Sequence, residues 1–165
     1  MQSKFFNHQG ASLHYQIGGK EAASVMVLLH GGFGSIADFE PLLPRLLQYY
    51  RVIAVDTRGH GRSTLGTTAL TYAQAADDVR QILRNESVEN YSLFGFSDGG
   101  ITAYRLGAED ENVEKIITVG AEWHQKHLNR VRSMFEALNL NIVKEKLSEQ
   151  LAAYQAANPE PDAEK

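Results

Sequence analysis

Gly95-Phe96-Ser97-Asp98-Gly99 decides the fold of this chain, because it places a serine between two glycines where one structural pattern changes into another. The preceding run, Tyr91–Phe94, is largely apolar and suits a strand, and the following run, Gly100–Leu106, suits a helix. A tight strand-to-helix turn is too crowded for Cβ atoms beside the serine, so glycine is needed there. The sequence therefore predicts that Ser97 projects its hydroxyl out of the turn as a nucleophile.

A second glycine-rich loop, His30-Gly31-Gly32-Phe33-Gly34, directly follows the apolar run Val25–Leu29. In acyl-transfer hydrolases with this layout, one oxyanion donor is the backbone N–H of the residue after the nucleophile. The other donor comes from the loop after the third strand. We therefore expect the oxyanion donors to be the N–H groups of Asp98 and of either Gly32 or Phe33.

Other interpretations of these two loops stay open. Ser97 can be an ordinary helix cap, and His30 can be a catalytic base, although its place before the serine favours an orienting or packing role. Gly32–Ala37 also matches the Gly-x-Gly-x-x-Gly/Ala fingerprint of dinucleotide-binding proteins, with Asp56 at about the spacing of a ribose-binding acid. The next helix is expected at residues 38–49, too late for a pyrophosphate site, which makes this the most distant alternative.

A third loop, Asp56-Thr57-Arg58-Gly59-His60-Gly61-Arg62-Ser63, follows the apolar run Arg51–Val55. An acid, an arginine and two glycines so close together are typical of a tight loop with internal charge-assisted hydrogen bonds. Asp56 and Arg58 are therefore predicted to be structural rather than catalytic, and His60 is predicted to face solvent.

Together, these loops resemble the amino-terminal part of an α/β-hydrolase, through Leu29–Gly32, Asp56–Ser63 and Gly95–Gly100. Gly95–Ala103, with an Asp after the nucleophile, is similar to the valacyclovirase-like (biphenyl hydrolase-like) esterases. The resemblance extends from about residue 5 to residue 150. It implies an α/β fold with a mostly parallel sheet and crossover helices. It also implies a serine hydrolase that acts on a small ester or amide through an acyl-enzyme at Ser97, without a cofactor or metal.

The order of elements along the chain agrees with such a sheet. We expect an opening hairpin at residues 4–8 and 12–17, further strands at 25–29, 51–56, 91–96 and 114–120, and helices at 38–49, 72–84 and 100–108. Alternating strands and helices predict parallel strands joined by crossover helices. Residues 1–121 are therefore assigned to the hydrolase core.

Beyond residue 121 the strand pattern gives way to two helical stripes, Leu128, Val131, Phe135 and Leu138, then Val143, Leu147, Leu151 and Tyr154. The resemblance implies that residues 122–157 form a helical lid, whereas periodicity alone also allows a helical extension packed on the core. Residues 158–165 are polar, contain proline and are predicted to fray.

Two further substrate contacts are considered, Asp98 and Trp123. The Asp98 carboxylate can simply complement the dipole at a helix start, or it can recognise a cationic group of the substrate, such as an amine. His124 and His127 have the i,i+3 spacing of a metal pair, but without a third ligand they are predicted to be solvated or to pack in the lid.

The acid and the His of this family's triad follow Ser97 in the chain order Ser, acid, His, after the seventh and eighth strands. Neither strand is found in these 165 residues. We therefore expect the chain to be the amino-terminal portion of a hydrolase, inactive alone, with an uncovered sheet edge through which it can form a homo-oligomer. The alternative is a non-catalytic binding or interaction protein of the same fold.

Composition excludes several other classes of protein. A net charge of −4 without a basic patch gives no support to nucleic-acid binding. The absence of cysteine excludes disulfides and thiolate metal sites, and it suits the cytoplasm. No apolar stretch approaches the roughly 20 residues of a membrane helix, so the expected partner is a small-molecule substrate rather than a membrane.

Overall fold

A computed structural model describes residues 1–124, 126, 129, 132 and 140–160 of the protein. Its core is one six-stranded sheet with the spatial order β1-β2-β4-β3-β5-β6. The strands are β1 (Gln2–His8), β2 (Ala11–Gly19), β3 (Val25–Leu29), β4 (Arg51–Val55), β5 (Tyr91–Phe96) and β6 (Val113–Val119). Strands β3 to β6 are parallel, whereas β2 runs antiparallel to both of its neighbours. The predicted α/β fold with a mostly parallel sheet is confirmed.

The opening hairpin of β1 and β2 is confirmed and is longer than predicted. Its two turn residues, Gln9 and Gly10, have φ angles of 46° and 76°. Two consecutive positive φ values are typical of a type I′ turn, whose twist matches that of the flanking strands.

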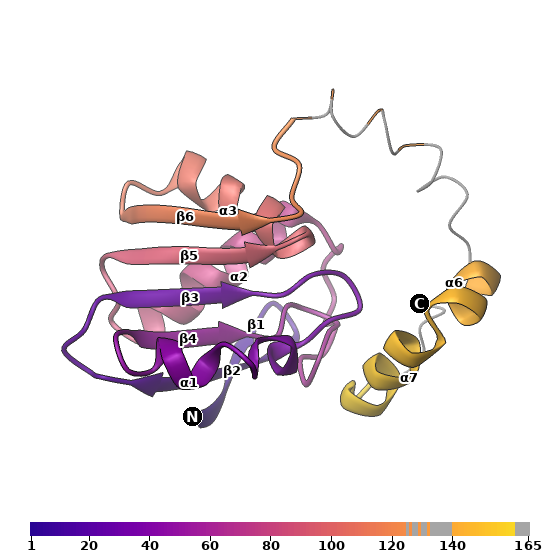
Figure 1. Cartoon of the computed structure of the whole chain (residues 1–165), viewed down its shortest axis with the longest axis horizontal. Helices are drawn as coiled ribbons and strands as arrows, with labels where there is room; N and C mark the ends of the chain where they lie inside the picture. Colours follow the sequence, from indigo (N-terminus) through magenta and orange to yellow (C-terminus); the bar gives the residue numbers. More distant parts are fainter. Residues whose placement is uncertain (125, 127–128, 130–131, 133–139, 161–165) are drawn as a thin grey trace.

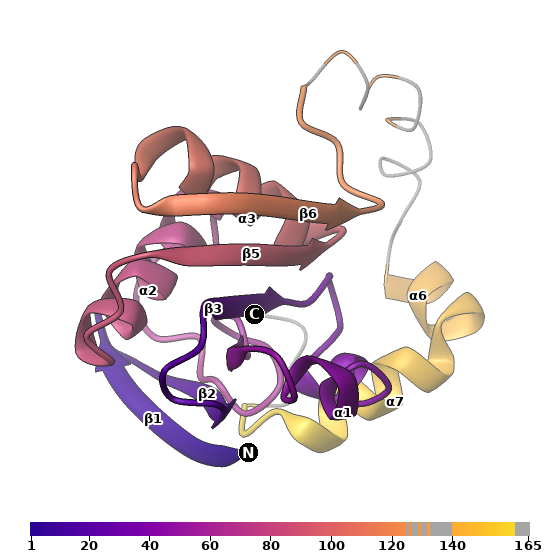
Figure 2. The same ribbon diagram turned by 60° about the vertical axis from the view of Figure 1, so that its left-hand side comes forward.

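Helices lie on both faces of the sheet (Figures 1 and 2). The helices α2 (Tyr72–Asn85) and α3 (Asp98–Glu109) cover one face, and the short η1 (Ile36–Phe39) and α1 (Leu43–Leu46) cover part of the other. Helix α2 lies where the sequence predicts it. It begins after Thr71, whose hydroxyl accepts a hydrogen bond from the N–H of Gln74.

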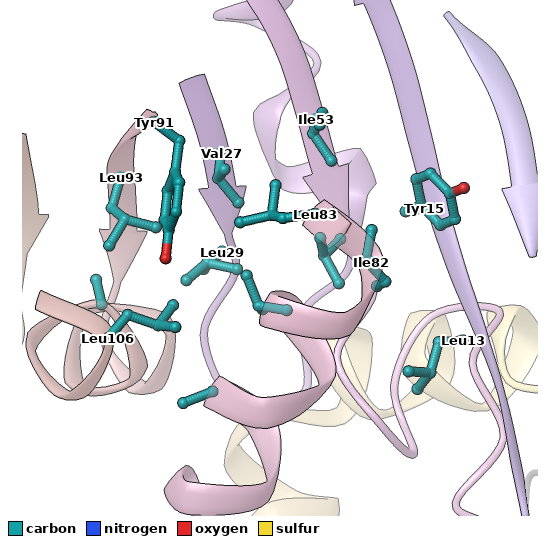
Figure 3. Packing of buried hydrophobic residues seen from close by; sticks show 14 of the residues in the cluster. Leu13, Tyr15, Val27, Leu29, Ile53, Ile82, Leu83, Tyr91, Leu93 and Leu106 are labelled. Atoms are coloured by element: carbon teal, nitrogen blue, oxygen red, sulfur yellow. The ribbon is translucent and has the colours of Figure 1, made fainter. Parts of the chain in front are cut away.

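The hydrophobic core consists of two layers because β3 alternates its side chains between the two faces. Val27 and Leu29 pack with residues of α2 and α3, as Figure 3 shows for Ile82, Leu83 and Leu106. Leu28 points the other way and packs with η1. Every residue of β3 is buried, as expected for a parallel strand with both faces covered.

Two predicted helix boundaries are wrong. The helix expected at residues 38–49 is a 3₁₀ turn followed by the single-turn α1, because Pro41 and Pro44 lack the N–H that a continuous helix needs. Helix α3 begins at Asp98, directly after Ser97, rather than at Gly100. Gly99 and Gly100 have no side chains, so the first turn of α3 can pack closely against the sheet.

Strand β6 lies at one edge of the sheet, and no described strand pairs with its outer side. Ile117 and Val119 are 47% and 48% exposed, unlike the buried residues of β3. An apolar edge strand of this kind is a template for pairing with further polypeptide.

The last described helices, α6 (Leu140–Lys146) and α7 (Ser148–Ala157), lie beyond the carboxyl ends of the parallel strands (Figure 1). The second predicted stripe falls on them, with Val143 and Leu151 buried, but Leu147 separates the two helices. The first stripe lies outside the described residues. Among the described helices, none is both long enough and apolar enough to cross a bilayer.

The tail does not begin to fray at residue 158. Asn158 is buried and its Nδ2 donates to the carbonyl oxygen of Gly59 at 2.8 Å. Glu160 accepts a hydrogen bond from the N–H of Leu65 at 2.7 Å. These partners lie in a distant loop, so the local composition of the tail did not indicate them.

Candidate active site

Ser97 occupies a strained turn between β5 and α3. Its φ and ψ angles are 50° and −116°, a backbone conformation that residues with a side chain rarely adopt. A Cβ on Gly95 would lie 2.5 Å from the carbonyl oxygen of Gly99, and one on Gly99 would lie 2.1 Å from that of Leu29. Both glycines are therefore required by close backbone contacts, as the sequence predicts for a turn that exposes a nucleophile.

The loop after β3 lies against this turn. A Cβ on Gly31 would lie 3.2 Å from Cβ of Ser97, and Phe33 has a φ of 58°. The N–H groups of Gly32, Phe33 and Asp98 donate to no acceptor among the described residues. The candidate oxyanion donors, Asp98 and either Gly32 or Phe33, thus belong to the Ser97 turn and to the loop that lies against it. The N–H of Asp98 is at the positive end of the α3 dipole.

His30 is buried beneath this loop and both of its ring nitrogens are occupied. Nδ1 donates to the carbonyl oxygen of Gly31 at 2.7 Å, which leaves Nε2 to accept from the N–H of Thr57 at 3.0 Å. Burial lowers the pKa of His30, so the ring is neutral at pH 7. Because the Nε2 lone pair is already used, His30 fits an orienting role better than that of a base.

Asp56 holds the loop after β4. Its carboxylate accepts from the N–H groups of Ile36 and Arg62, at 2.8 and 2.9 Å, and from Nδ1 of His14 at 2.6 Å. Burial alone would raise the pKa of Asp56, but these three donors outweigh it and leave the pKa below its usual value. A carboxylate so fully engaged suits the predicted structural role and leaves little capacity for a ribose.

Arg58 and Asp78 form a buried bidentate ion pair between the loop after β4 and α2. Nε and Nη2 of Arg58 donate to the two carboxylate oxygens at 2.9 and 2.7 Å. Arg58 also donates to the carbonyl oxygen of Leu65 at 3.1 Å. It is about 1% exposed, which agrees with the predicted structural role.

A cavity of about 460 Å³ opens beside the Ser97 turn. It is lined by His30, Gly31, Gly32, Thr57, His60, Leu70, Thr71, Tyr72, Ala75, Asp98, Gly99 and Thr102. Sequence reasoning missed the wall contributed by Leu70, Tyr72 and Ala75, since nothing local distinguishes these residues from an ordinary helix start. Trp123 does not line the cavity and is 67% exposed.

The Asp98 side chain points toward that wall. Oδ1 of Asp98 accepts a hydrogen bond from the hydroxyl of Tyr72 at 2.5 Å. Burial of Tyr72 and the neighbouring carboxylate raise the pKa of its hydroxyl, so it remains a donor across the physiological range. Asp98 thus places a carboxylate at the cavity, one residue from Ser97.

The prediction that His60 faces solvent is wrong, because its side chain is half-buried and lines the cavity. The centroid of its ring lies 5.5 Å from that of the His30 ring and 5.5 Å from that of the Tyr154 ring. Tyr154 comes from α7 and donates its hydroxyl to the carbonyl oxygen of Gly59 at 2.7 Å. The ring that covers His60 is therefore more than ninety residues away in the sequence. The prediction that His124 and His127 form a solvated or lid-packing pair is not tested, because His127 lies outside the described residues.

Residues 24–152 match the family model described as alpha/beta hydrolase fold. The chain belongs to this family. The α/β-hydrolase fold accounts for the sheet order, for the serine turn after β5 and for the loop after β3.

Several proteins similar to this chain are named as hydrolases. The chain is 36% identical over 101 residues to 3-oxoadipate enol-lactonase 1 of Acinetobacter baylyi, covering 61% of this chain and 38% of the relative. It is 28% identical to esterase YbfF of Escherichia coli, covering 70% and 46% of the two chains. A carboxylesterase structure from Nitrososphaera gargenis superposes with a TM-score of 0.74 at 25% identity, over 91% of this chain and 57% of the other. The chain thus spans less than half the length of these two curated relatives.

Proposed function

We propose that this α/β-hydrolase is a serine hydrolase that cleaves a small ester or amide through an acyl-enzyme. The observation that carries the proposal is the strained Ser97 turn beside a loop with available N–H groups. Ser97 Oγ attacks the substrate carbonyl carbon, and the N–H groups of Asp98 and of Gly32 or Phe33 stabilise the oxyanion. The leaving group departs with a proton, and water then releases the acid.

The general base and its acid are proposed to come from outside residues 1–165. Among the described residues, no side chain makes a hydrogen bond with the Ser97 hydroxyl. His30 has no free lone pair, and a serine without a positioned base is a poor nucleophile. The partial coverage of the curated relatives is consistent with this division. Residues 122–157 are proposed to be part of the lid.

Covalent capture tests the nucleophile. The protein translated from the complete reading frame containing residues 1–165 is treated with a fluorophosphonate probe and digested. We expect the adduct on the peptide that carries Ser97, and we expect that peptide to stay unmodified in Ser97→Ala. Equal modification of this peptide in Ser97→Ala, on Ser87 or Ser92 for example, or a probe found only on another peptide, would exclude Ser97 as the nucleophile.

A non-catalytic binding protein of this fold is the second candidate, because the Ser97 hydroxyl has no base among the described residues. The two candidates differ in what the complete reading frame has to contain. A hydrolase needs an Asp or Glu and then a His after further strands, whereas a binding protein does not. A dinucleotide-binding role receives less support, since the Asp56 carboxylate is occupied by three donors.

Asp98 is proposed to bind a cationic group of the substrate, and the exposed Trp123 to add a contact from the loop after β6. A charge-assisted hydrogen bond contributes on the order of 1.5–3 kcal/mol, or roughly ten- to hundredfold in kcat/KM. We expect the full enzyme to prefer an aminoacyl ester to its des-amino analogue by that factor, and Asp98→Asn to lose the preference. Tyr72→Phe is the matched control, because it keeps the carboxylate and removes its hydroxyl partner. An unchanged preference in Asp98→Asn excludes amine recognition by Asp98.

A further inference from the structure

Ser3, His14 and Asp56 form a chain of hydrogen bonds on the hairpin side of the sheet, at the opposite edge from β6. Nδ1 of His14 lies 2.6 Å from Oδ2 of Asp56, and Nε2 of His14 lies 2.7 Å from Oγ of Ser3. Ser3 is on β1, His14 is on β2 and Asp56 directly follows β4. The three residues come from neighbouring strands, so the pairing of the sheet holds them together.

The chemistry of each atom fixes the direction of the hydrogen bonds. Asp56 is held as a carboxylate by two backbone donors and can only accept, so Nδ1 of His14 carries the proton. Nη1 of Arg62, which can only donate, lies 3.5 Å from Nε2. In the neutral ring Nε2 carries a lone pair, and the Ser3 hydroxyl can donate to it. This is the orientation in which a histidine can remove a proton from a serine, with its ring fixed by a carboxylate.

Arg62 supplies the positive charge next to this serine. Its Nη1 donates to Oγ of Ser3 at 3.1 Å and lies 3.5 Å from Nε2 of His14. The guanidinium is held over the ring of Phe5, 5.1 Å from its centroid, and that ring also lies against His14. Negative charge that develops on Ser3 therefore has a fixed cation beside it.

The histidine and the carboxylate of this network are buried, whereas its serine is exposed. His14 and Asp56 are 1% and 2% exposed, so the base and the group that orients it are shielded from water. Ser3 is exposed and can meet a reagent from solution. A purely structural network would link the strands equally well, but it would not need an exposed hydroxyl at its end.

We propose that Ser3 is a second nucleophilic hydroxyl, activated by His14 and Asp56, that takes an acyl group from a small activated ester. Ser3 Oγ forms a bond to the acyl carbon while the ester C–O bond breaks. The hydroxyl proton passes to Nε2 of His14 and from there to the departing alcohol. The acyl-serine then persists as a modification of β1.

Peptide mapping after brief treatment with p-nitrophenyl acetate tests this proposal in the protein carrying Ser97→Ala, so its outcome is independent of the hydrolase site. Ser24 is the internal reference, because it is an exposed serine for which no hydrogen bond from the hydroxyl to a described histidine is found. General base catalysis is typically worth about 10²–10⁴-fold, and we expect Ser3 to be acetylated at least about 10²-fold faster than Ser24. Ser3→Ala confirms the assignment of the modified peptide.

His14→Gln is expected to reduce the acetylation of Ser3 to the rate of Ser24, with far-ultraviolet circular dichroism as the check on folding. The comparison of Ser3 with Ser24 in the protein that keeps His14 does not depend on whether His14→Gln folds. Equal acetylation of the two serines there overturns the proposal, whatever the His14 variant does. Fast acetylation of Ser3 that survives in a folded His14→Gln variant also overturns it, because His14 would then not be the base.

Discussion

Residues 1–165 on their own are expected to hydrolyse p-nitrophenyl acetate no faster than the same residues with Ser97→Ala. The Ser97 hydroxyl has no hydrogen-bonded base in the described part of the chain, and both ring nitrogens of His30 are occupied. Loss of a triad base typically lowers kcat by on the order of 10⁴–10⁶-fold. The steady-state release of p-nitrophenolate by the two purified proteins measures the difference.

His60 is the residue that could contradict this expectation. Its Nδ1 donates to the carbonyl oxygen of Arg58 at 3.1 Å, which leaves Nε2 with a lone pair, and its ring lines the cavity. A turnover that depends on Ser97 and disappears in His60→Gln would identify His60 as the base. The proposed base outside residues 1–165 would then be wrong. Ser3 is present in both proteins and does not affect the comparison.

Asp78→Ala is expected to destabilise the protein by about 3–5 kcal/mol, because it leaves the guanidinium of Arg58 buried without its carboxylate. Both side chains of the pair are almost completely inaccessible, so solvent screens the lost interaction very little. The free energy of unfolding from urea titration, followed by circular dichroism, measures the loss.

The matched control replaces both members of the pair, Arg58→Met with Asp78→Leu. Removing a buried charge together with its partner is far less costly than removing one of them. The double variant should therefore recover much of the lost stability, although the carbonyl oxygen of Leu65 loses its donor. A double variant as unstable as Asp78→Ala would mean that packing, and not the unpaired charge, dominates.

The sequence was sufficient for those features that depend on neighbouring residues. The turn at Ser97 was predictable because the glycines that it requires, Gly95 and Gly99, lie only two positions away. The buried strand β3 was predictable because its apolar run is continuous. The hydrogen bond that Asp56 accepts within its own loop, from the N–H of Arg62, was predictable from the composition of that loop. The prolines that divide the helix after β3 were also visible, and their effect was underestimated.

The features that sequence reasoning missed depend on residues that are distant along the chain. Tyr72 meets Asp98 from the start of another helix, and neither residue carries a local sign of the contact. His60 was misplaced because the ring that covers it belongs to Tyr154. Ser3 and His14 similarly reach Asp56 only through strand pairing. Local patterns can identify a turn, but not which side chains the fold brings to it.

The hydrogen bonds that Tyr154 and Asn158 make with Gly59 affect the motions of the native protein. Tyr154 and Asn158 reach Gly59 across 95 and 99 residues, and few buried side chains support them. Releasing such a contact exposes little apolar surface, so we expect α7 to separate from Gly59 without global unfolding. The amide of Leu65, held by Glu160, should therefore exchange its hydrogen for deuterium sooner than the amides of β3. Its exchange rate would report how often α7 and the Tyr154 ring separate from His60 and Phe33. It would also report how often solvent reaches these two residues from that side.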